Sequence, residues 1–295
     1  PKVLPAGIAS RIPPYYFYDI QSHIFSDITP KDRLSISFYN GIDDLIFDTF
    51  GLMAKWGNNT VSSHYRRVFS ERLIGNFLIA NSVFFTEFGL GGDSGLKSDN
   101  EIDDITISGN MTWFKSPQTT VKFGLQHKTL GFKYLNAFQD SIQFLIKTRP
   151  AEIAQYVKFK YSPNSLLIIE PGLRINYYDV YPDSIFPDLR LGMKYLLTED
   201  RYLNISVGNY HQFICTFQDD FYPTILDQWI AVDRSVAPGK STQFVLGYEE
   251  YIRNIYKVQI EGYYKDIKNL LTFEEKRSST DAEVSDERLS DILTP

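Results

Sequence analysis

The sequence predicts an all-β chain that folds as a transmembrane, antiparallel, up-and-down β-barrel, present here as a partial barrel of about twelve strands. Three observations lead to this prediction. Apolar and polar residues alternate with period two, short and long connections alternate along the chain, and aromatic residues make up 15% of it. Period-two alternation places one face of a strand in an apolar medium and the other against water. Long strands joined by alternating short turns and long loops are typical of membrane barrels.

Composition narrows the class of protein further. Of the 295 residues, 43% are hydrophobic, which is too apolar for a disordered chain. The net charge is −6, whereas a nucleic-acid binder needs a basic surface, so we expect no nucleic-acid partner. The longest apolar stretch, residues 77–85, is shorter than the ~18 residues that a membrane helix requires. Strands are therefore the elements with which this chain is predicted to cross a membrane.

Twelve segments carry the strand pattern. Several exceed the ~5–6 residues usual in soluble sheets and reach the ~9–11 residues of a tilted membrane strand. In chain order the segments span residues 14–28, 32–42, 52–69, 72–89, 103–115, 119–135, 151–161, 165–180, 187–197, 201–215, 241–251 and 255–273.

The connections predict how these strands are arranged. Six of them are short and rich in turn-forming residues, and they lie near Pro30, Glu71, Pro117, Pro163, Glu199 and Arg253. Between them lie longer connections, at 43–51, 90–102, 136–150, 181–186 and 217–240. We predict a meander with all six tight turns at one rim. A soluble β-sandwich is the alternative fold, but its Greek-key connections would break the regular alternation of short and long connections.

The phase of the alternation predicts which side chains face lipid. The apolar phase, expected to point outward, includes Val121, Phe123, Leu191, Met193, Ile205, Val207, Val258 and Ile260. The polar phase, expected to face the concave side, includes Lys122, Arg190, Lys194, Ser206, Lys257 and Glu261. We assign residues 1–274 to the barrel segment. Residues 275–295, rich in Ser, Glu and Asp, are predicted to form a polar loop or disordered tail.

Several segments resemble TonB-dependent outer-membrane receptors, and their order and spacing agree with that family over nearly all of residues 12–273. One departure is Lys158-Phe-Lys160, where the family has a Gln-Asp pair. The segments are Pro14-Tyr-Tyr-Phe-Tyr-Asp-Ile-Gln, Asp32-Arg-Leu-Ser-Ile-Ser-Phe-Tyr-Asn-Gly41, Pro150-Ala-Glu-Ile-Ala-Gln-Tyr-Val157, Gly172-Leu-Arg-Ile-Asn-Tyr-Tyr178, Pro187-Asp-Leu-Arg-Leu-Gly-Met-Lys-Tyr195, Leu203-Asn-Ile-Ser-Val-Gly-Asn-Tyr-His-Gln212, and Gly247-Tyr-Glu-Glu250 with 258–266.

The resemblance implies active uptake of a scarce solute across the outer membrane of a Gram-negative-type bacterium. The family's barrel has 22 strands around an N-terminal plug and is energised by the inner-membrane TonB complex. This chain would then be the middle part of such a barrel, with outer-membrane lipid, plug, TonB complex and an unknown solute as partners. A twelve-strand barrel that closes on itself is the second choice. The alternative functions are a passive porin-like channel and a structural or adhesive surface barrel.

The longest internal connection holds the candidate ligand-binding residues. Long loops on a rigid scaffold usually carry binding function, and this one offers rings for stacking and charges for polar contacts. We therefore expect it to fold over the barrel mouth and contribute to solute capture. The candidates are Asp219, Asp220, Phe221, Tyr222, Asp227, Trp229, Asp233 and Arg234.

Residues that carry catalysis or hold metals are not evident. Gly92-Asp-Ser-Gly95 matches the tetrapeptide around a serine-protease nucleophile, but no histidine has the context of a base. We predict that the chain is not an enzyme and needs no cofactor. The acidic stretch 99–104 reads as a solvated loop, and we predict no metal site. Its weak candidate ligands for a hard cation are Asp99, Glu101, Asp103 and Asp104.

Overall fold

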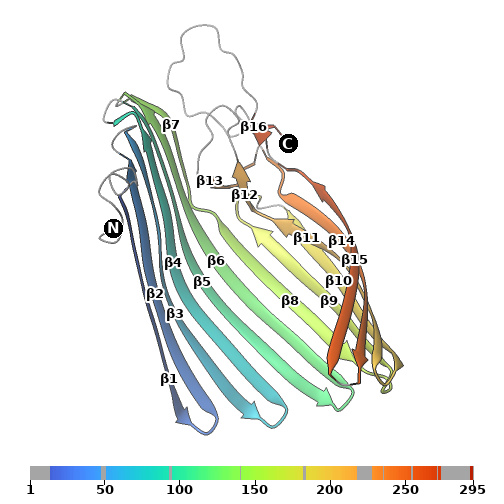
Figure 1. Cartoon of the computed structure of the whole chain (residues 1–295). Helices are drawn as coiled ribbons and strands as arrows, with labels where there is room; N and C mark the ends of the chain where they lie inside the picture. Colours follow the sequence, from blue (N-terminus) through green and yellow to red (C-terminus); the bar gives the residue numbers. More distant parts are fainter. Residues whose placement is uncertain are drawn as a thin grey trace.

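Most described residues lie in β-strands, and thirteen strands form one curved antiparallel sheet (Figure 1). The structure, a computed structural model, describes residues 14–47, 51–92, 95–139, 141–181, 184–217, 228–234, 236–253, 255–270, 272–273 and 293–294. The strands of the sheet are β1 (Tyr15–Thr29), β2 (Asp32–Phe47), β3 (Leu52–Ser70), β4 (Leu73–Leu90), β5 (Leu96–Ser116), β6 (Thr119–Phe138), β7 (Ser141–Thr148), β8 (Ala151–Tyr161), β9 (Leu167–Tyr178), β10 (Ile185–Thr198), β11 (Arg201–Gln212), β14 (Gly239–Ile252) and β15 (Tyr256–Lys268).

The sheet is the predicted meander. Strands pair in the order β1-β2-β3-β4-β5-β6-β8-β9-β10-β11-β14-β15, and β7 pairs with β6. The six tight turns all lie at the lower rim in Figure 1. The all-β fold, its antiparallel order and the position of the turns are thus confirmed. No helix in the described ranges is long and apolar enough to cross a membrane.

Two predicted loops are wrong because the strands continue into them. β5 begins at Leu96, so most of the predicted loop 90–102 is strand. β7 occupies 141–148, so the predicted loop 136–150 shrinks to a hairpin turn. β7 and β8 run along β6 in one register on either side of 149–150, and a bulge at Asn136/Ala137 shifts the register next to the hairpin turn. Leu130 N–H donates to Pro150 O at 3.0 Å, and proline, without an N–H, cannot return the bond.

The ends of two other predicted strands also differ. β11 stops at Gln212 rather than at 215, and a separate hairpin follows, formed by β12 (Ile214–Phe217) and β13 (Gln228–Ala231). After β15, β16 (Thr272–Phe273) pairs with β17 (Leu293–Thr294). The remainder of the predicted tail 275–295 lies outside the described residues, so the boundary at 274 stays a prediction.

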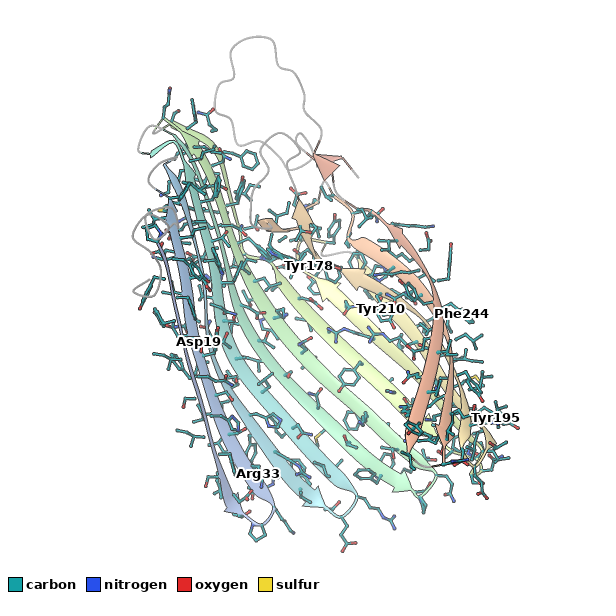
Figure 2. The ribbon with its side chains drawn as sticks, in the orientation of Figure 1. Asp19, Arg33, Tyr178, Tyr195, Tyr210 and Phe244 are labelled. Atoms are coloured by element: carbon teal, nitrogen blue, oxygen red, sulfur yellow. The ribbon has the colours of Figure 1, made fainter. Side chains whose placement is uncertain are left out.

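Strand register confirms the two faces. Leu191, Val207, Phe244 and Tyr264 occupy one row across neighbouring strands, so the apolar phases coincide. Lys122, Lys158, Gly172 and Arg190 occupy a row of the opposite face. This second face is the concave one. It also carries Leu130 and Phe132 of β6, which pack against Ala231 of the β12–β13 hairpin, and the hairpin lies inside the curve of the sheet (Figure 1). Tyr178 and Tyr210 also lie on the concave side (Figure 2).

The core sits between the hairpin and the concave face near the loop rim. One cluster of buried residues joins Tyr134, Tyr178 and Phe213 of the wall to the segment after Cys215 through Ile230, Val232 and Val236. A second cluster joins Leu130 and Phe132 of β6 to Ala231. Elsewhere the convex face exposes its apolar side chains, as a lipid-facing surface does. In the part of the chain that the structure describes, β1 and β15 are the two edges of the sheet.

Candidate functional site on the concave face

A row of cationic side chains crosses the middle of the concave face. Lys122 of β6 lies directly opposite Lys158 of β8, and Gly172 of β9 separates this pair from Arg190 of β10. Gly172 has no side chain, and the nearest atom to a Cβ built on it would be 3.6 Å away. The space above this glycine, between the charged side chains, is therefore unfilled. The register therefore gathers three cations from strands that are distant in sequence.

These cations line a hollow of about 510 Å³, which we call the cationic hollow. Arg174 adds a fourth positive charge, and Tyr156, Tyr210 and Glu170 complete the polar part of its wall. The Arg190 guanidinium lies 4.5 Å from the centre of the Tyr210 ring, a cation–π contact. Lys158 Nζ lies 2.5 Å from Glu170 Oε2. Four cations and one carboxylate line the hollow, and behind its wall Arg174 and Arg190 are also paired with Glu152 and Asp188, at 3.2 and 3.7 Å. The lining itself carries more positive than negative charge, which suits an anionic group.

Arg174 is held in place by hydrogen bonds from three strands. It donates to Gln126 Oε1 at 2.9 Å and to Glu152 Oε1 at 3.2 Å, and its Nε donates to Asn176 Oδ1 at 2.7 Å. Bonds of this kind fix the planar guanidinium in one orientation. The charge at the upper wall of the cationic hollow is therefore preorganised.

The same network continues through buried polar groups on β9 to β11. Asn176 Nδ2 donates to Asp188 Oδ2 at 3.1 Å, and His211 Nδ1 hydrogen-bonds Asp188 Oδ1 at 2.7 Å. Asn176 and Asp188 are both 2% exposed. Buried polar groups stabilise a structure only when they are satisfied, and here each of them has a partner.

Asn100 fastens the hairpin to the wall from β5. Its Nδ2 donates to Trp229 O at 3.1 Å, and its Oδ1 accepts from Trp229 N–H at 3.2 Å. The amide thus pairs with the backbone of β13 much as a neighbouring strand would. Asn100 is fully buried, and its Nδ2 also donates to Lys133 O of β6 at 3.5 Å, so its amide joins β13 to two strands of the wall.

Two tyrosines fasten the segment that follows β13. Tyr178 Oη donates to Val232 O at 3.1 Å, and the Tyr181 hydroxyl bonds the carbonyls of Asp233 and Val236. Burial raises the pKa of Tyr181, so the hydroxyl keeps the proton that it donates. The hairpin is therefore fixed by hydrogen bonds to the concave face of the sheet.

Solved structures of other proteins share this arrangement of strands. No family model matches the chain, and no curated protein matches it. Solved structures do match: the siderophore receptor PirA of Acinetobacter baumannii has a TM-score of 0.70 at 11% identity, over 98% of this chain and 48% of that one. PirA of Pseudomonas aeruginosa has a TM-score of 0.69 at 12% identity, over 89% of this chain and 48% of its own. The chain has the barrel fold of TonB-dependent receptors.

Further matches agree with that fold. The alcaligin receptor FauA of Bordetella pertussis has a TM-score of 0.66 at 12% identity, over 88% of this chain and 45% of its own. This chain spans about half the length of the receptors that it matches. These proteins are named as receptors.

The predicted ligand-binding residues divide into two groups in this receptor fold. Five of them, Asp219, Asp220, Phe221, Tyr222 and Asp227, lie outside the described residues. The other three belong to the anchored hairpin: Trp229 packs on the β6 cluster, and the Asp233 carbonyl accepts a bond from Tyr181. Arg234 Nε donates to Val180 O at 3.0 Å. In this structure these three residues hold the hairpin, and contact with a ligand stays a prediction.

The acidic stretch lies on a strand, and its carboxylates point to different faces. Asp99 and Asp103 share the convex face of β5, and Asp104 lies on the concave face. Each has a cation nearby: Lys97 at 3.2 Å, Arg149 at 3.1 Å and Lys128 at 3.2 Å respectively. Within the ranges that the structure describes, no group of three or more His, Cys, Asp or Glu residues could hold a metal ion.

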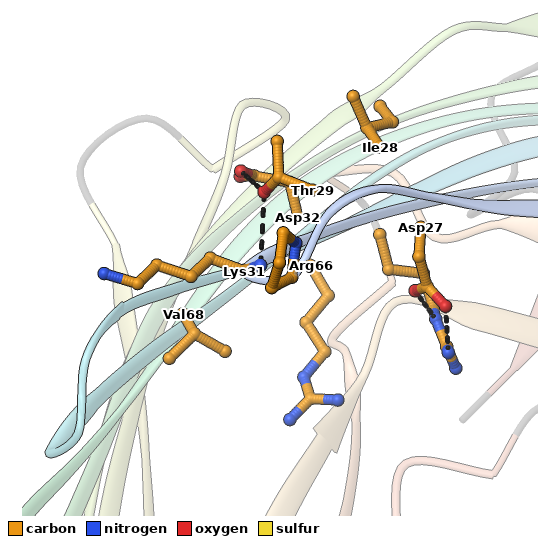
Figure 3. A pocket seen from close by; sticks show the side chains of 9 residues that line it. Asp27, Ile28, Thr29, Lys31, Asp32, Arg66 and Val68 are labelled. Atoms are coloured by element: carbon orange, nitrogen blue, oxygen red, sulfur yellow. Dashed lines mark hydrogen bonds and ion pairs between the residues drawn. The ribbon is translucent and has the colours of Figure 1, made fainter.

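A second hollow, of about 500 Å³, opens at the β1–β2 turn (Figure 3). Its carboxylates are already engaged. Arg33 donates to both oxygens of Asp27, at 2.6 and 2.9 Å, and Thr29 Oγ1 donates to Asp32 Oδ2 at 2.5 Å. These contacts stabilise the tight turn, so we place the functional site in the cationic hollow.

Sequence reasoning placed Lys122 and Arg190 on the concave face but missed the cationic hollow. The missing information is the register between strands, which decides that Lys122, Lys158 and Arg190 share one row. The signal in the sequence was the pair of glycines, Gly172 and Gly192, on the same face as these cations.

Proposed function

We propose that the whole protein is a TonB-dependent receptor of the outer membrane of a Gram-negative-type bacterium, and that this chain forms the middle part of its barrel wall. The observation that carries the proposal is the pair of opposite faces: an apolar convex face fit for lipid and a polar concave face with a preorganised cationic hollow. The two sheet edges, β1 and β15, would be covered by further strands of the full barrel.

The proposed partners follow from these two faces. Outer-membrane lipid would cover the convex side, and a plug domain coupled to the TonB complex would fill the concave side. Nucleic acid is not among the proposed partners, since the net charge is −6.

An iron–siderophore complex is the proposed solute. Receptors of similar fold are named for siderophores, ferric enterobactin and alcaligin. Such complexes carry negatively charged oxygen ligands, which cationic side chains and aromatic rings recognise. Four cations with Tyr156 and Tyr210 supply these groups on the lumen wall. We propose that Asp219, Asp220, Phe221, Tyr222 and Asp227 of the loop above meet the solute first.

Uptake by the full-length protein tests this proposal. Replacing Lys122 and Arg190 together by alanine should weaken the apparent affinity for the solute at least tenfold, since each charge-assisted contact contributes about 1.5–3 kcal/mol. Lys160→Ala is the matched control, because it removes a cation from the same face at the turn rim. Equal affinities of the double variant and the control, with both inserted, would refute the assigned site.

A passive channel is the second candidate, because the β12–β13 hairpin folds inward as a constriction would. The two functions differ in their need for energy. Uptake that stops when the TonB complex is deleted supports the receptor. Undiminished uptake without that complex, together with steady conductance in a planar bilayer, would identify a channel instead.

A further inference from the structure

The convex face carries an exposed pair of lysines near the loop rim. Lys133 of β6 lies directly opposite Lys147 of β7. Glu101 of β5 lies directly opposite Lys133 on its other side, but among the described residues no carboxylate oxygen lies within 4.0 Å of either lysine. Like charges at directly opposite positions destabilise a sheet. An anionic ligand between the two ammonium groups would remove that repulsion.

Arg149 extends this pair into a cluster. Its guanidinium lies 3.1 Å from Asp103 Oδ2, and Asp103 lies opposite Gly131. A Cβ on Gly131 would be 1.8 Å from Asp103 Oδ1, so only glycine leaves room for this carboxylate beside Arg149. Lys133, Lys147 and Arg149, which we call the convex cationic cluster, surround a hollow of about 260 Å³ that Glu101 also lines.

The height of this cluster on the barrel matches a lipid headgroup. Lys133 lies 12 residues from Val121, which pairs with Trp113 at the turn rim. At ~3.3 Å per residue and a tilt of ~35–45°, this separation is about 30 Å along the membrane normal. The apolar band of an outer-membrane barrel is ~25 Å tall. With Trp113 at one interface, the cluster reaches the headgroup layer of the other.

The side chains between these two levels support this placement. From Trp113 to Ile105 the convex-facing residues of β5 are Trp113, Met111, Gly109, Ile107 and Ile105, and none is charged. The next convex-facing residue is Asp103, the partner of Arg149. The charged cluster therefore begins where the hydrocarbon ends.

We propose that the convex cationic cluster binds the phosphate groups of a phosphorylated glycolipid in the outer leaflet of the membrane. This inference rests on the proposed outer-membrane location, in which long loops face outward. The two lysines supply point charges for phosphate, and Arg149 a planar donor. The Glu101 carboxylate accepts hydrogen bonds from sugar hydroxyls, which fits a phosphorylated sugar better than a bare phosphate.

The test is binding of bis-phosphorylated lipid A to the full-length protein in detergent, compared between the wild type and Lys133→Gln/Lys147→Gln. A lysine near an anionic lipid surface contributes about fivefold in affinity, so the double variant should bind about 25-fold more weakly. The matched control is Lys115→Gln/Lys160→Gln, two exposed lysines of β5 and β8 at the turn rim, far from the convex cationic cluster. It should keep the wild-type affinity for lipid A.

Three outcomes would overturn the inference: equal affinities of wild type and Lys133→Gln/Lys147→Gln, equal binding of lipid A stripped of its phosphates, and competition by inorganic phosphate at equal concentration. Solute uptake by the same proteins is a separate readout. A wild type that binds lipid A but takes up no solute refutes the proposed function alone. A variant that takes up solute normally but keeps full lipid affinity refutes the convex cluster alone.

Discussion

Single side chains decide whether the hairpin stays on the wall. Asn100 pairs with the backbone of Trp229 through both its Nδ2 and its Oδ1, and its Nδ2 also donates to Lys133 O. No apolar residue of similar size can make any of these bonds. Leaving a buried donor or acceptor unpaired costs about 1–3 kcal/mol. The fixed position of the hairpin thus depends on an amide that the sequence shows only as one polar residue in an acidic stretch.

Asn100→Leu should release β13 from β5. We expect a red-shifted Trp229 fluorescence and faster amide exchange at 228–231, because the backbone of β13 loses its partner and gains water. Asn59→Leu, the same change at an exposed position of β3, should leave both readouts unchanged. Unaltered exchange in Asn100→Leu would mean that apolar packing alone holds the hairpin.

Cys215 reports on the same hairpin through its reactivity. Burial raises the pKa of its thiol to about 12, compared with ~8.5 for a free cysteine. Only about one thiol in ten thousand is then ionised near pH 8, and the thiolate is the reactive form. Maleimide should label the native protein very slowly, about tenfold faster per pH unit, and rapidly after unfolding. Fast labelling near pH 8 in the native state would show that the hairpin is open.

At the scale of strands, the period-two alternation of apolar and polar residues predicted which segments form strands better than it predicted where those strands begin and end. β5 extends to Leu96 through Asp99, Glu101 and Asp103, all on the convex face. In the proposed receptor this part of the convex face lies above the membrane and meets water, so the apolar phase disappears while backbone pairing continues. The β12–β13 hairpin gave no signal at all, because four-residue strands are too short to show a period.

Adjacent residues of one strand should respond oppositely to the same substitution. Ile107 lies on the convex face and Ser108 on the concave face, so in the proposed receptor they face lipid and lumen respectively. Ile107→Arg places a charge in the hydrocarbon band, where it costs about 2–4 kcal/mol. Ser108→Arg places it in the polar lumen, where the loss should be well below 1 kcal/mol. Reversible folding of the full-length protein into lipid vesicles measures both values. Similar losses for the two variants would contradict the assignment of faces.

At the scale of the whole molecule, the sheet is defined by its two edges. β1, which is 15 residues long, pairs on one side with β2, and β15 pairs on one side with β14. Both edges carry exposed large apolar side chains, with Ile24 68% and Tyr263 80% exposed. Long, exposed, apolar edge strands associate with other chains unless they are covered. The resemblance to larger receptors indicated that these edges exist, but residue patterns within the chain do not say what covers them.

The chain by itself should therefore fail to form a monomer in detergent. Each edge offers a row of unpaired N–H and C=O groups, which are costly in an apolar medium. We expect oligomers by light scattering and rapid exchange of the outward amides of β1, whereas in the full-length receptor these amides should be protected. A monodisperse monomer of 34.1 kDa with protected β1 amides would instead mean that β1 and β15 pair with each other. The sheet would then be a closed small barrel, and a receptor of twice its length would no longer be needed to explain it.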